Sequence, residues 1–392
     1  MPTVYNQSLS TGGRDTLDLT TLQRKVQVKD IINLLEPDKA PLVVLLNRLR
    51  TEKGGPEYNW LEDVLLPRTV LTSSGASAAA TTINVTAGEG SYFKAGDLVK
   101  VIRTGEVIRV TASAANTLTT VASPNGRGFA GTAAAINNGD ELACVGYAAP
   151  ENAGAPALVQ TQVSSVKNYT QIFRTPFGGS RTLESSPLYG GSDRAYLRKK
   201  MLIEHLIDME KSLLFGLAKE NTTATSGRPT RSSGGLENFI TTNITSLDSS
   251  GLDSVADIEN FLMTGFRYGS DTKLLYASPL VIQKINELAL ADITVYPKES
   301  VYGLNIRRWE SSHGTVNIIK SKILEGPQTK GMAFLLDMEN LGRMCLDDTF
   351  LRTNIQGNDI DGWADEYVTE CGWMVMQEKT HAILKNADGG AF

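Results

Sequence analysis

The sequence predicts an α+β fold, because helical and β-rich segments follow one another in blocks along its 392 residues. Residues 69 to 150 are rich in Ala, Thr, Gly, Val and Ser and contain short runs of β-forming residues. Residues 192 to 219 carry apolar side chains at helical spacing, and residues 254 to 348 alternate between amphipathic helices and strands. With 41% hydrophobic residues, the chain can fill the cores of about two or three domains.

The overall charge and the cysteines argue against several classes of protein. Lys and Arg total 38 against 43 Asp and Glu, a formal net charge of −5 that gives no general attraction to nucleic acid or an anionic membrane. Cys144, Cys345 and Cys371 form no CxxC pair, so we predict buried free thiols rather than a disulfide framework or a zinc site. The chain begins without a secretory signal pattern, and its apolar runs are too short to span a bilayer. These features predict a soluble protein in a reducing cytoplasm.

The first part of the chain predicts an arm followed by short helices. Residues 1 to 27 are polar and are expected to become ordered against a partner. The stretch DIINLLEPDKAPLVVLLNRLR, residues 30 to 50, predicts two short apolar helices separated by a Glu-Pro pair, with Pro41 in the first turn of the second. Residues 57 to 68, EYNWLEDVLLPR, alternate well enough for an extended segment.

Residues 69 to 150 predict a small β-barrel or sandwich, inserted between parts of a larger fold. Turns containing Gly or Asn separate the β-type runs roughly every ten residues. The runs are TTINVT, DLVKVIR, EVIRVTA, NTLTTVA and DELACVGYA. Thr104, Gly105 and Glu106 are expected to form the turn between the second and third of these runs.

The longest predicted helix spans residues 192 to 219. Ser192 can cap it, and Asp193 favours its positive end. Apolar residues recur at helical spacing at Leu202, Leu206, Leu213 and Leu217. The charged residues are expected to form a solvated or partner-facing side, which consists of Arg198, Lys199, Glu204, Asp208, Glu210 and Lys211.

The last part of the chain predicts helices and strands in alternation. Ser254 and Ser278 are expected to cap two helices that flank a strand at 272 to 278. Further strands are expected at 304 to 310, 316 to 322, 332 to 338 and 343 to 348. Residues 365 to 386 favour strand for most of their length, and a helical portion near Asp365 stays open.

Three motifs suggest chemistry, and each has a structural interpretation that fits better. Residues 126 to 131 spell G-x-G-x-x-G, but the residues after them are too few to form the helix that a dinucleotide site needs, so we predict a β-domain loop. The carboxylates at 357 to 366 lack the spacing of a calcium-binding loop, which favours a solvated turn or a cap. His205, His313 and His381 stand alone, and His205 is expected to be a packing or interface residue. We predict no catalytic residue, metal or cofactor.

Taken in order, the segments resemble the major capsid proteins of tailed bacteriophages with the Hong Kong 97-type fold. Within that family they are most similar to the subgroup whose extended loop carries an added β-domain. The resemblance covers nearly the whole chain and depends on the order of the segments rather than on one sharp motif. The segments that carry it are DIINLLEPDKAPLVVLLNRL, EYNWLEDVLLP, AGDLVKVIRTGEVIRVTA, MLIEHLIDMEKSLLFG, GGLENFI, DIENFLMTGFRYGSDTKLLYASPLVIQKINEL, VYGLNIRRWESSHGTVNIIKSKIL and VMQEKTHAILKN.

The resemblance implies a Hong Kong 97-like fold built from four parts, with the β-domain added. The first two are an N-terminal arm at 1 to 52 and an extended loop at 53 to 180, which includes the inserted β-domain at 69 to 150. The third is a peripheral domain at 181 to 235 and 341 to 392, with a spine helix at 192 to 219. The fourth is an axial domain at 236 to 340. The extended loop would lie over a neighbouring subunit, and its β-domain would clamp neighbours on the outer shell.

The resemblance also implies contacts between subunits, in which arginines meet carboxylates of a neighbour. The candidate contact residues are Trp60, Glu62, Asp63, Arg68, Arg174 and Arg181. Some relatives form covalent cross-links through a Lys, an Asn and a Glu. No such trio can be placed in this sequence, so non-covalent clamping is expected. No long acidic or helical leader precedes the arm, which indicates that any scaffolding protein comes from another gene.

The implied function is that of a structural major capsid protein, without enzymatic activity, that self-assembles into the icosahedral shell around a tailed phage's double-stranded DNA. Its partners would be other copies of itself in hexamers and pentamers, a portal protein, and scaffolding or decoration proteins. Packaged DNA would contact the inner face non-specifically, and no membrane would be involved. The protein would assemble in the cytoplasm of the host bacterium and reside in the virion.

Two other functions stay open. An encapsulin-like nanocompartment shell would share the architecture, although such shells usually have a shorter loop. A hydrolase or ligand-binding protein that uses the segment at 69 to 150 would need exposed aromatic residues. That segment offers Tyr92, Phe93, Phe129 and Tyr147, most of which its core should need.

Overall fold

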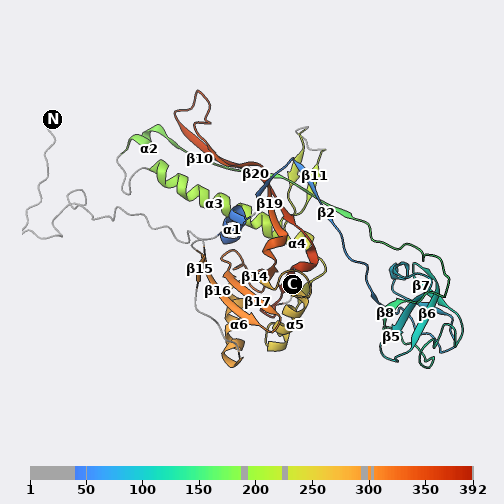
Figure 1. Ribbon diagram of the computed structural model, residues 1–392. Helices are drawn as coiled ribbons and strands as arrows, with labels where there is room; N and C mark the ends of the chain where they lie inside the picture. The colour runs from blue at the N-terminus through green and yellow to red at the C-terminus, as the bar shows by residue number, and fades with distance from the viewer. Residues whose placement is uncertain are drawn as a thin grey trace, which may run out of the picture. The chain divides into compact units, whose positions relative to one another are not determined.

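The computed structural model describes residues 40–49, 51–186, 193–222, 228–292, 299–301 and 304–390. The chain divides into two compact units (Figure 1), a larger one of Met1–Trp60 with Lys167–Phe392 and a smaller one of Leu61–Val166. Strands β2 (Glu57–Glu62) and β9 (Ser164–Tyr169) pair with each other where the chain passes between the units. The first predicted helix, before the Glu-Pro pair, and the predicted cap Ser192 lie outside the described residues.

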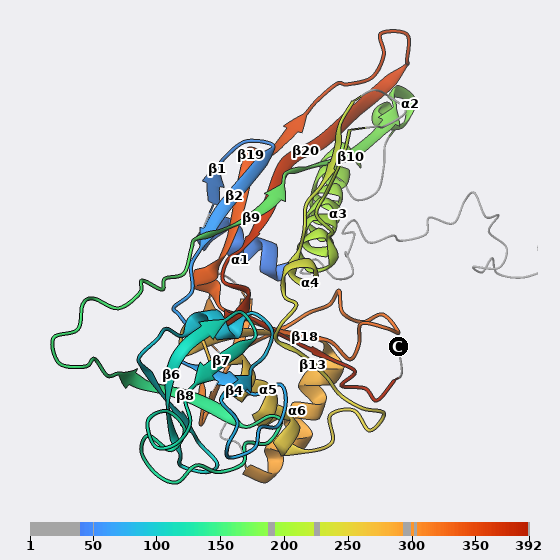
Figure 2. The same cartoon turned by 90° about the vertical axis from the view of Figure 1, so that its right-hand side faces the viewer.

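A four-stranded sheet and one long helix form one part of the larger unit. The sheet has the order β1-β19-β20-β10, with β1 parallel to β19 and the other neighbours antiparallel. Its strands are β1 (Thr51–Lys53), β10 (Gln171–Ser180), β19 (Leu341–Arg352) and β20 (Gly362–Val375). Helix α3 (Asp193–Phe215) lies along β10 and β20, as Figure 2 shows, and the short α2 (Arg181–Ser185) precedes it.

A seven-stranded sheet with two helices forms the other part of the larger unit. Its order is β13-β21-β18-β14-β17-β16-β15. Its strands are β13 (Ile244–Ser246), β14 (Thr272–Ala277), β15 (Glu299–Val301), β16 (Leu304–Ser311), β17 (Gly314–Lys320), β18 (Ala333–Leu336) and β21 (Ala382–Lys385). The helices are α5 (Val255–Gly265) and α6 (Pro279–Asp292). The predicted caps are confirmed, because Ser254 accepts from the backbone N–H of Ala256 and Ser278 from that of Val281, both at 3.2 Å.

Strand β14 contributes to two hydrophobic cores because its side chains alternate between the faces of the sheet. Leu275 and Ala277 pack in the core that contains the buried residues of α5 and α6. Leu274 and Tyr276 face the other core, which also contains Leu213 of α3 and buried residues of the four-stranded sheet. Strands β17, β18 and β21 also contribute side chains to both cores, so the central strands of this sheet together join the two parts of the larger unit.

Short elements complete the larger unit. They are α1 (Pro41–Leu49), α4 (Leu236–Phe239), β11 (Lys219–Asn221), β12 (Thr230–Ser232), η2 (Met338–Asn340) and η3 (Glu378–Thr380). Helix α1 begins at Pro41, as predicted, since proline suits a position where the helix needs no N–H donor. Helix α4 follows Gly235, where a Cβ would lie 2.4 Å from the Leu213 carbonyl oxygen. Glycine therefore allows α4 to approach the end of α3.

The smaller unit is a six-stranded sheet of order β3-β8-β5-β6-β7-β4. Its elements are β3 (Thr69–Leu71), β4 (Thr82–Asn84), η1 (Glu89–Tyr92), β5 (Asp97–Val101), β6 (Val107–Ala114), β7 (Thr117–Thr120) and β8 (Glu141–Tyr147). A bridge between Thr72 and Val85 joins the two outermost strands, so the sheet closes on itself. Alternate residues such as Val99 and Ile108 fill its core. Each of the five β-type runs predicted here contains one observed strand or most of it.

The G-x-G-x-x-G loop of the smaller unit is organised around a fully buried ion pair. Arg127 donates to both carboxylate oxygens of Glu106, at 2.8 and 3.0 Å, and also to the Ser77 carbonyl. Glu106 accepts the backbone N–H of Gly128 at 2.8 Å. Burial alone would raise the pKa of Glu106, but the hydrogen bonds from Arg127 and the backbone hold that pKa below its usual value. The motif therefore serves the core of the smaller unit.

The structure refines three sequence expectations. The segment near Asp365 is strand β20, as favoured, and the helical alternative is wrong, since its residues pair across to β10. The long helix ends at Phe215, because the chain turns at Gly216 toward β11. Strand β21 belongs to the seven-stranded sheet, where it lies between β13 and β18, so residues 382–385 pack with the segment assigned to the axial domain.

Removing the guanidinium of Arg127 tests whether the ion pair holds the smaller unit together. In Arg127→Met, Glu106 would keep a buried charge without its partner, so we expect a loss of about 3–5 kcal/mol in the free energy of unfolding. Denaturant unfolding followed by circular dichroism measures this change. Lys100→Met, at an exposed position of β5, is the matched control and should change stability by less than about 0.5 kcal/mol. Equal stabilities of the two variants would contradict the assignment.

Candidate assembly surfaces

Three of the six candidate contact residues lie on or just after β2, and a fourth, Arg68, directly precedes β3. The ring of Trp60 is buried and packs edge-on against Phe239, with 5.4 Å between the ring centroids. The Asp63 carboxylate accepts the Thr161 hydroxyl at 3.1 Å, and the Glu62 carbonyl accepts a hydroxyl of β9 at 3.2 Å. Arg68 is exposed and donates to the sulfur of Cys144 at 3.6 Å. Trp60 therefore belongs to the core, whereas Asp63 and Arg68 lie at the surface.

The other two candidates, Arg174 and Arg181, pair with carboxylates of the same chain. Arg174 on β10 donates to Glu366 on β20 through Nε at 3.0 Å and through Nη2. Arg181 at the start of α2 donates to Asp361 at 2.6 Å, and both of these side chains are largely exposed. The structure thus brings these two arginines to the carboxylates of the 357 to 366 segment.

Two adjacent carboxylates in that segment are buried, contrary to the expectation of a solvated turn. Asp365 and Glu366 are 0% and 1% exposed, because they lie inside β20 and point to opposite faces of the sheet. On one side, Asp365 accepts hydrogen bonds from Arg194 and Arg198 of α3, both at 2.8 Å. On the other side, Glu366 accepts from Arg174 and Arg352. The arginines supply the charge and the donors that a buried carboxylate needs.

The electrostatics of Asp365 follow from these partners. Burial alone would raise its pKa, but the hydrogen bonds from Arg194 and Arg198 and from the backbone N–H of Asn354 outweigh burial. The pKa of Asp365 therefore lies below its usual value, and the carboxylate stays ionised at neutral pH. Helix α3 is fixed to the long β20 strand by charge as well as by apolar packing.

The most deeply buried charge of α3 is Glu210. Its Oε2 accepts the backbone N–H groups of Leu42 and Val43, at 3.0 and 3.2 Å, so it caps the first turn of α1. Its Oε1 accepts the hydroxyl of Tyr276 on β14, which in turn accepts the Ser321 hydroxyl at 2.9 Å. Burial raises the pKa of Glu210 to about 7. One carboxyl group thus joins α1, α3 and the seven-stranded sheet.

The sequence placed Glu210 on a solvated or partner-facing side of the long helix, and this is wrong, because the side chain is buried among partners of its own chain. Glu210 lies four residues after Leu206 and three before Leu213, so helical spacing puts it on the apolar face. A carboxylate at such a position needs donors from another element, and α1 provides them. The helical spacing could have predicted that Glu210 is buried. It could not have predicted the hydrogen-bond donors, because these are the backbone N–H groups of the distant residues 42 and 43.

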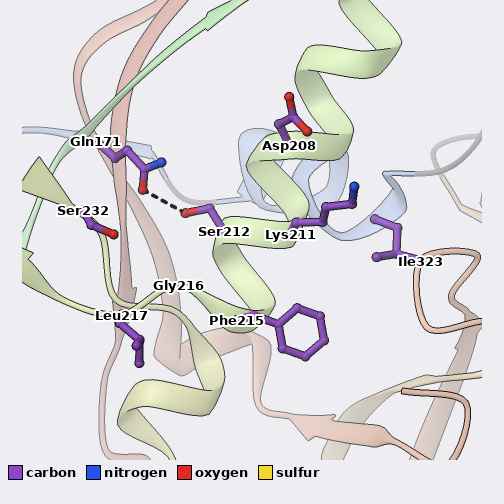
Figure 3. A pocket seen from close by; sticks show the side chains of 9 residues that line it. All are labelled: Gln171, Asp208, Lys211, Ser212, Phe215, Gly216, Leu217, Ser232 and Ile323. Atoms are coloured by element: carbon purple, nitrogen blue, oxygen red, sulfur yellow. Dashed lines mark hydrogen bonds between the residues drawn. The ribbon is translucent and has the colours of Figure 1, made fainter. Parts of the chain in front are cut away.

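A surface hollow of about 620 Å³ lies beside the C-terminal end of α3 (Figure 3). It is lined by Gln171, Asp208, Lys211, Ser212, Phe215, Gly216, Leu217, Ser232 and Ile323. The Ser212 hydroxyl donates to the Gln171 side-chain oxygen at 3.3 Å and accepts the indole N–H of Trp373 at 3.4 Å. The lining mixes apolar and polar side chains, as is typical of a surface that packs against another protein segment.

The histidines occupy structural positions. His205 is fully buried between Thr175 and Thr369, with 2.9 Å and 2.7 Å from its ring nitrogens to the two hydroxyls, which confirms its prediction as a packing residue. Burial lowers its pKa, and burial also lowers the pKa of His381 to about 4. Among the described residues, no group of three or more His, Cys, Asp and Glu side chains is placed to hold a metal ion. In the same part of the chain, no helix is long and apolar enough to cross a membrane.

Comparison with solved structures identifies the class of fold. The capsid of a native GTA particle matches with a TM-score of 0.50 and 8% identity, covering 94% of this chain and 96% of that one. A structure from Microbacterium phage Oxtober96 matches with a TM-score of 0.48 and 10% identity over 95% and 98% of the two chains. The SrpI encapsulin of Synechococcus elongatus PCC 7942 has a TM-score of 0.42 and 13% identity over 59% and 80%. The match over nearly the whole length of the GTA capsid subunit shows that the two chains share a mixed α/β fold.

Sequence comparison then gives the family. The major capsid protein of Pseudomonas phage PaMx41 is 22% identical over 316 residues, which are 77% of this chain and 74% of that protein. The model of the SU10 major capsid protein family matches residues 8–388. The chain therefore belongs to the SU10 major capsid protein family. This assignment confirms the phage capsid function over the nanocompartment and the ligand-binding alternatives.

The raised pKa of Glu210 predicts a specific pH dependence of stability. The folded protein holds this proton up to about pH 7, whereas the unfolded chain releases it near pH 4.5. The stabilising contribution is complete below pH 4.5 and is lost as the pH rises through 7, by about 3 kcal/mol in total. Glu210→Gln cannot ionise, so its free energy of unfolding should lack this decline.

Unfolding curves at pH 5, 6, 7 and 8 measure the difference between the two proteins. Glu204→Gln is the matched control, because Glu204 is exposed on the same helix, and it should follow the wild-type profile. Parallel profiles for wild type and Glu210→Gln would show that Glu210 ionises normally and would contradict the prediction.

Proposed function

We propose that this major capsid protein self-assembles, as hexamers and pentamers, into the icosahedral shell that encloses the double-stranded DNA of a tailed phage. The observation that carries the proposal is the family match over residues 8–388, which spans both compact units. A fold shared with another capsid subunit over nearly its whole length supports it. Closed symmetric shells multiply modest contacts between identical subunits, so no single interface has to be strong.

We assign the parts of a Hong Kong 97-like fold as follows. Residues 1 to 52 act as the N-terminal arm, and residues 53 to 180 act as the extended loop with its inserted β-domain at 69 to 150. Helix α3 is the spine helix of a peripheral domain at 181 to 235 and 341 to 392. The axial domain comprises residues 236 to 340, and β21 of the last segment adds a strand to its sheet. The separate compactness of Leu61–Val166 and the two sheets of the larger unit support this division.

The contact residues proposed on the extended loop are Glu62, Asp63 and Arg68. The apolar surface around these residues supports the proposal, since Leu61 and Leu65 are 74% and 95% exposed. Exposed leucines next to charged side chains are typical of a surface that a partner covers. Trp60, Arg174 and Arg181 meet partners of their own chain, so we propose that they position this loop and the β10–β20 strands for assembly.

We further propose the partners and the place of assembly. Copies of this chain meet a portal protein, and scaffolding or decoration proteins, in the cytoplasm of the host bacterium, and the finished shell contacts DNA without sequence preference. The net charge of −5 supports weak contact with DNA, because a strongly basic inner wall would compete with packaging. The protein then acts as a structural component of the virion and performs no reaction.

Negative-stain electron microscopy of the protein expressed alone, with size-exclusion chromatography beside it, tests the assembly proposal. We expect closed shells, tubes or rings of capsomers, which elute far ahead of a 42.4 kDa monomer. The second arm of the experiment adds the other head proteins of the same phage. A folded monomer at every concentration and ionic strength in both arms would contradict self-assembly.

The double variant Glu62→Ala/Asp63→Ala tests the proposed contact on the extended loop. We expect the unassembled subunit to keep its thermal midpoint within about 2 °C, since both side chains lie at or near the surface. Particles should become less stable to heat and to high salt, because ion pairs between subunits are lost. Glu151→Ala, at an exposed position of the same unit, is the control and should leave particles unchanged. If the double variant forms normal particles of unchanged thermal stability, Glu62 and Asp63 do not form ion pairs between subunits.

A further inference from the structure

Two of the three cysteines face each other across the four-stranded sheet. Cys345 on β19 is the direct register partner of Cys371 on β20, although the two lie far apart in the sequence. Directly opposed residues of antiparallel strands have Cα atoms about 4.5 or 5.5 Å apart, depending on the pair type. Both separations fall in the range of about 4.4–6.8 Å that protein disulfides use. Both thiols are free in this structure.

The surroundings distinguish this pair from two packing residues. Cys345 and Cys371 are 3% and 0% exposed and form a hydrogen bond with each other. The guanidinium of Arg343, itself 1% exposed, lies beside them and donates to Cys371. The hydrogen bond from Cys345 lowers the pKa of the Cys371 thiol, and Arg343 lowers it further. Cys371 is thus the better nucleophile of the two.

The ladder between β19 and β20 is irregular next to this pair. The register shifts between Cys345 and Asp347, and again between Asp347 and Phe350, so regular pairing is interrupted on one side of Cys345. Bulged ladders have fewer regular hydrogen bonds and are places where strands open locally. A small oxidant can reach the thiols through such an opening without unfolding of the whole unit.

We propose that Cys345 and Cys371 are a site of intrachain disulfide formation, which joins β19 to β20 when the protein meets a small-molecule disulfide such as oxidised glutathione. The Cys371 thiolate attacks one sulfur of the oxidant, forms a mixed disulfide and releases one glutathione thiolate. Cys345 loses its proton to that thiolate and attacks the Cys371 sulfur, which releases the second glutathione thiolate. The two protein thiols are oxidised, and one oxidised glutathione becomes two reduced glutathiones.

The reaction suits a protein that is made in one redox environment and used in another. A reducing cytoplasm keeps both thiols free while subunits fold, and a particle released from its host meets oxidising conditions. The new bond restricts the unfolded chain, so the oxidised protein is more stable than the reduced one. The inference depends on the fold of one subunit and would survive failure of the assembly proposal.

Non-reducing peptide mapping of the full-length folded protein tests the proposal. The protein is incubated with oxidised glutathione, then denatured in N-ethylmaleimide and cleaved with trypsin, which separates Cys345 in peptide 344–352 from Cys371 in peptide 353–379. We expect these two peptides to become linked within one chain. The thermal midpoint should rise by about 5 °C, and reductant should reverse both changes.

Cys144 is the internal control, because it is partly exposed in the smaller unit and has no opposed cysteine. It should take up a single glutathione, which shows that the oxidant was active. Cys345→Ala should abolish the linked peptides and the rise in midpoint while it leaves the reaction of Cys144 unchanged. Modification of Cys144 without any link between the two peptides of wild-type protein would overturn the proposal, as would links between different chains.

Discussion

The buried carboxyl group of Glu210 is the contact on which the arrangement of the larger unit depends. It accepts two N–H groups from the first turn of α1 and the hydroxyl of Tyr276, so three segments distant in sequence meet at one side chain. Helix α1 has nine residues, and a helix of that length is marginal in isolation. Its buried leucines and the cap from Glu210 hold it against α3.

Buried ion pairs occur in both units, at positions where they favour one register or one packing of neighbouring elements over others. Asp365 lies between two arginines of α3, and in the smaller unit Arg127 engages both oxygens of Glu106. Such pairs add little net stability compared with apolar packing, but breaking one leaves an uncompensated charge. They therefore penalise wrong registers of long strands and wrong positions of helices. A shell subunit benefits from this, because each copy must present the same surface to its neighbours.

The sequence predicted most elements of the fold, because periodicity and caps are local signals. Five of the six strands of the smaller unit, the helices after Ser254 and Ser278, and the start of α1 at Pro41 agree with the structure. The errors concern long-range partners. Glu210 was placed on a solvated side because its donors lie at residues 42 and 43, and the segment around Asp365 was expected to be a turn because its arginines come from α3 and β10. Contacts between subunits could be proposed only through a resemblance, since the sequence of one chain does not say which of its surfaces a neighbour covers.

Hydrogen–deuterium exchange of the unassembled subunit, followed by mass spectrometry on peptides that contain Leu42 and Val43, tests the central claim most directly. If Glu210 caps α1 inside the folded core, these two amides should exchange as slowly as those of strand β18, through opening of the whole unit. Glu210→Ala should accelerate them while β18 stays protected. Exchange of both amides within seconds in the wild-type protein would contradict the account, because it would show that α1 is not held by the carboxyl group.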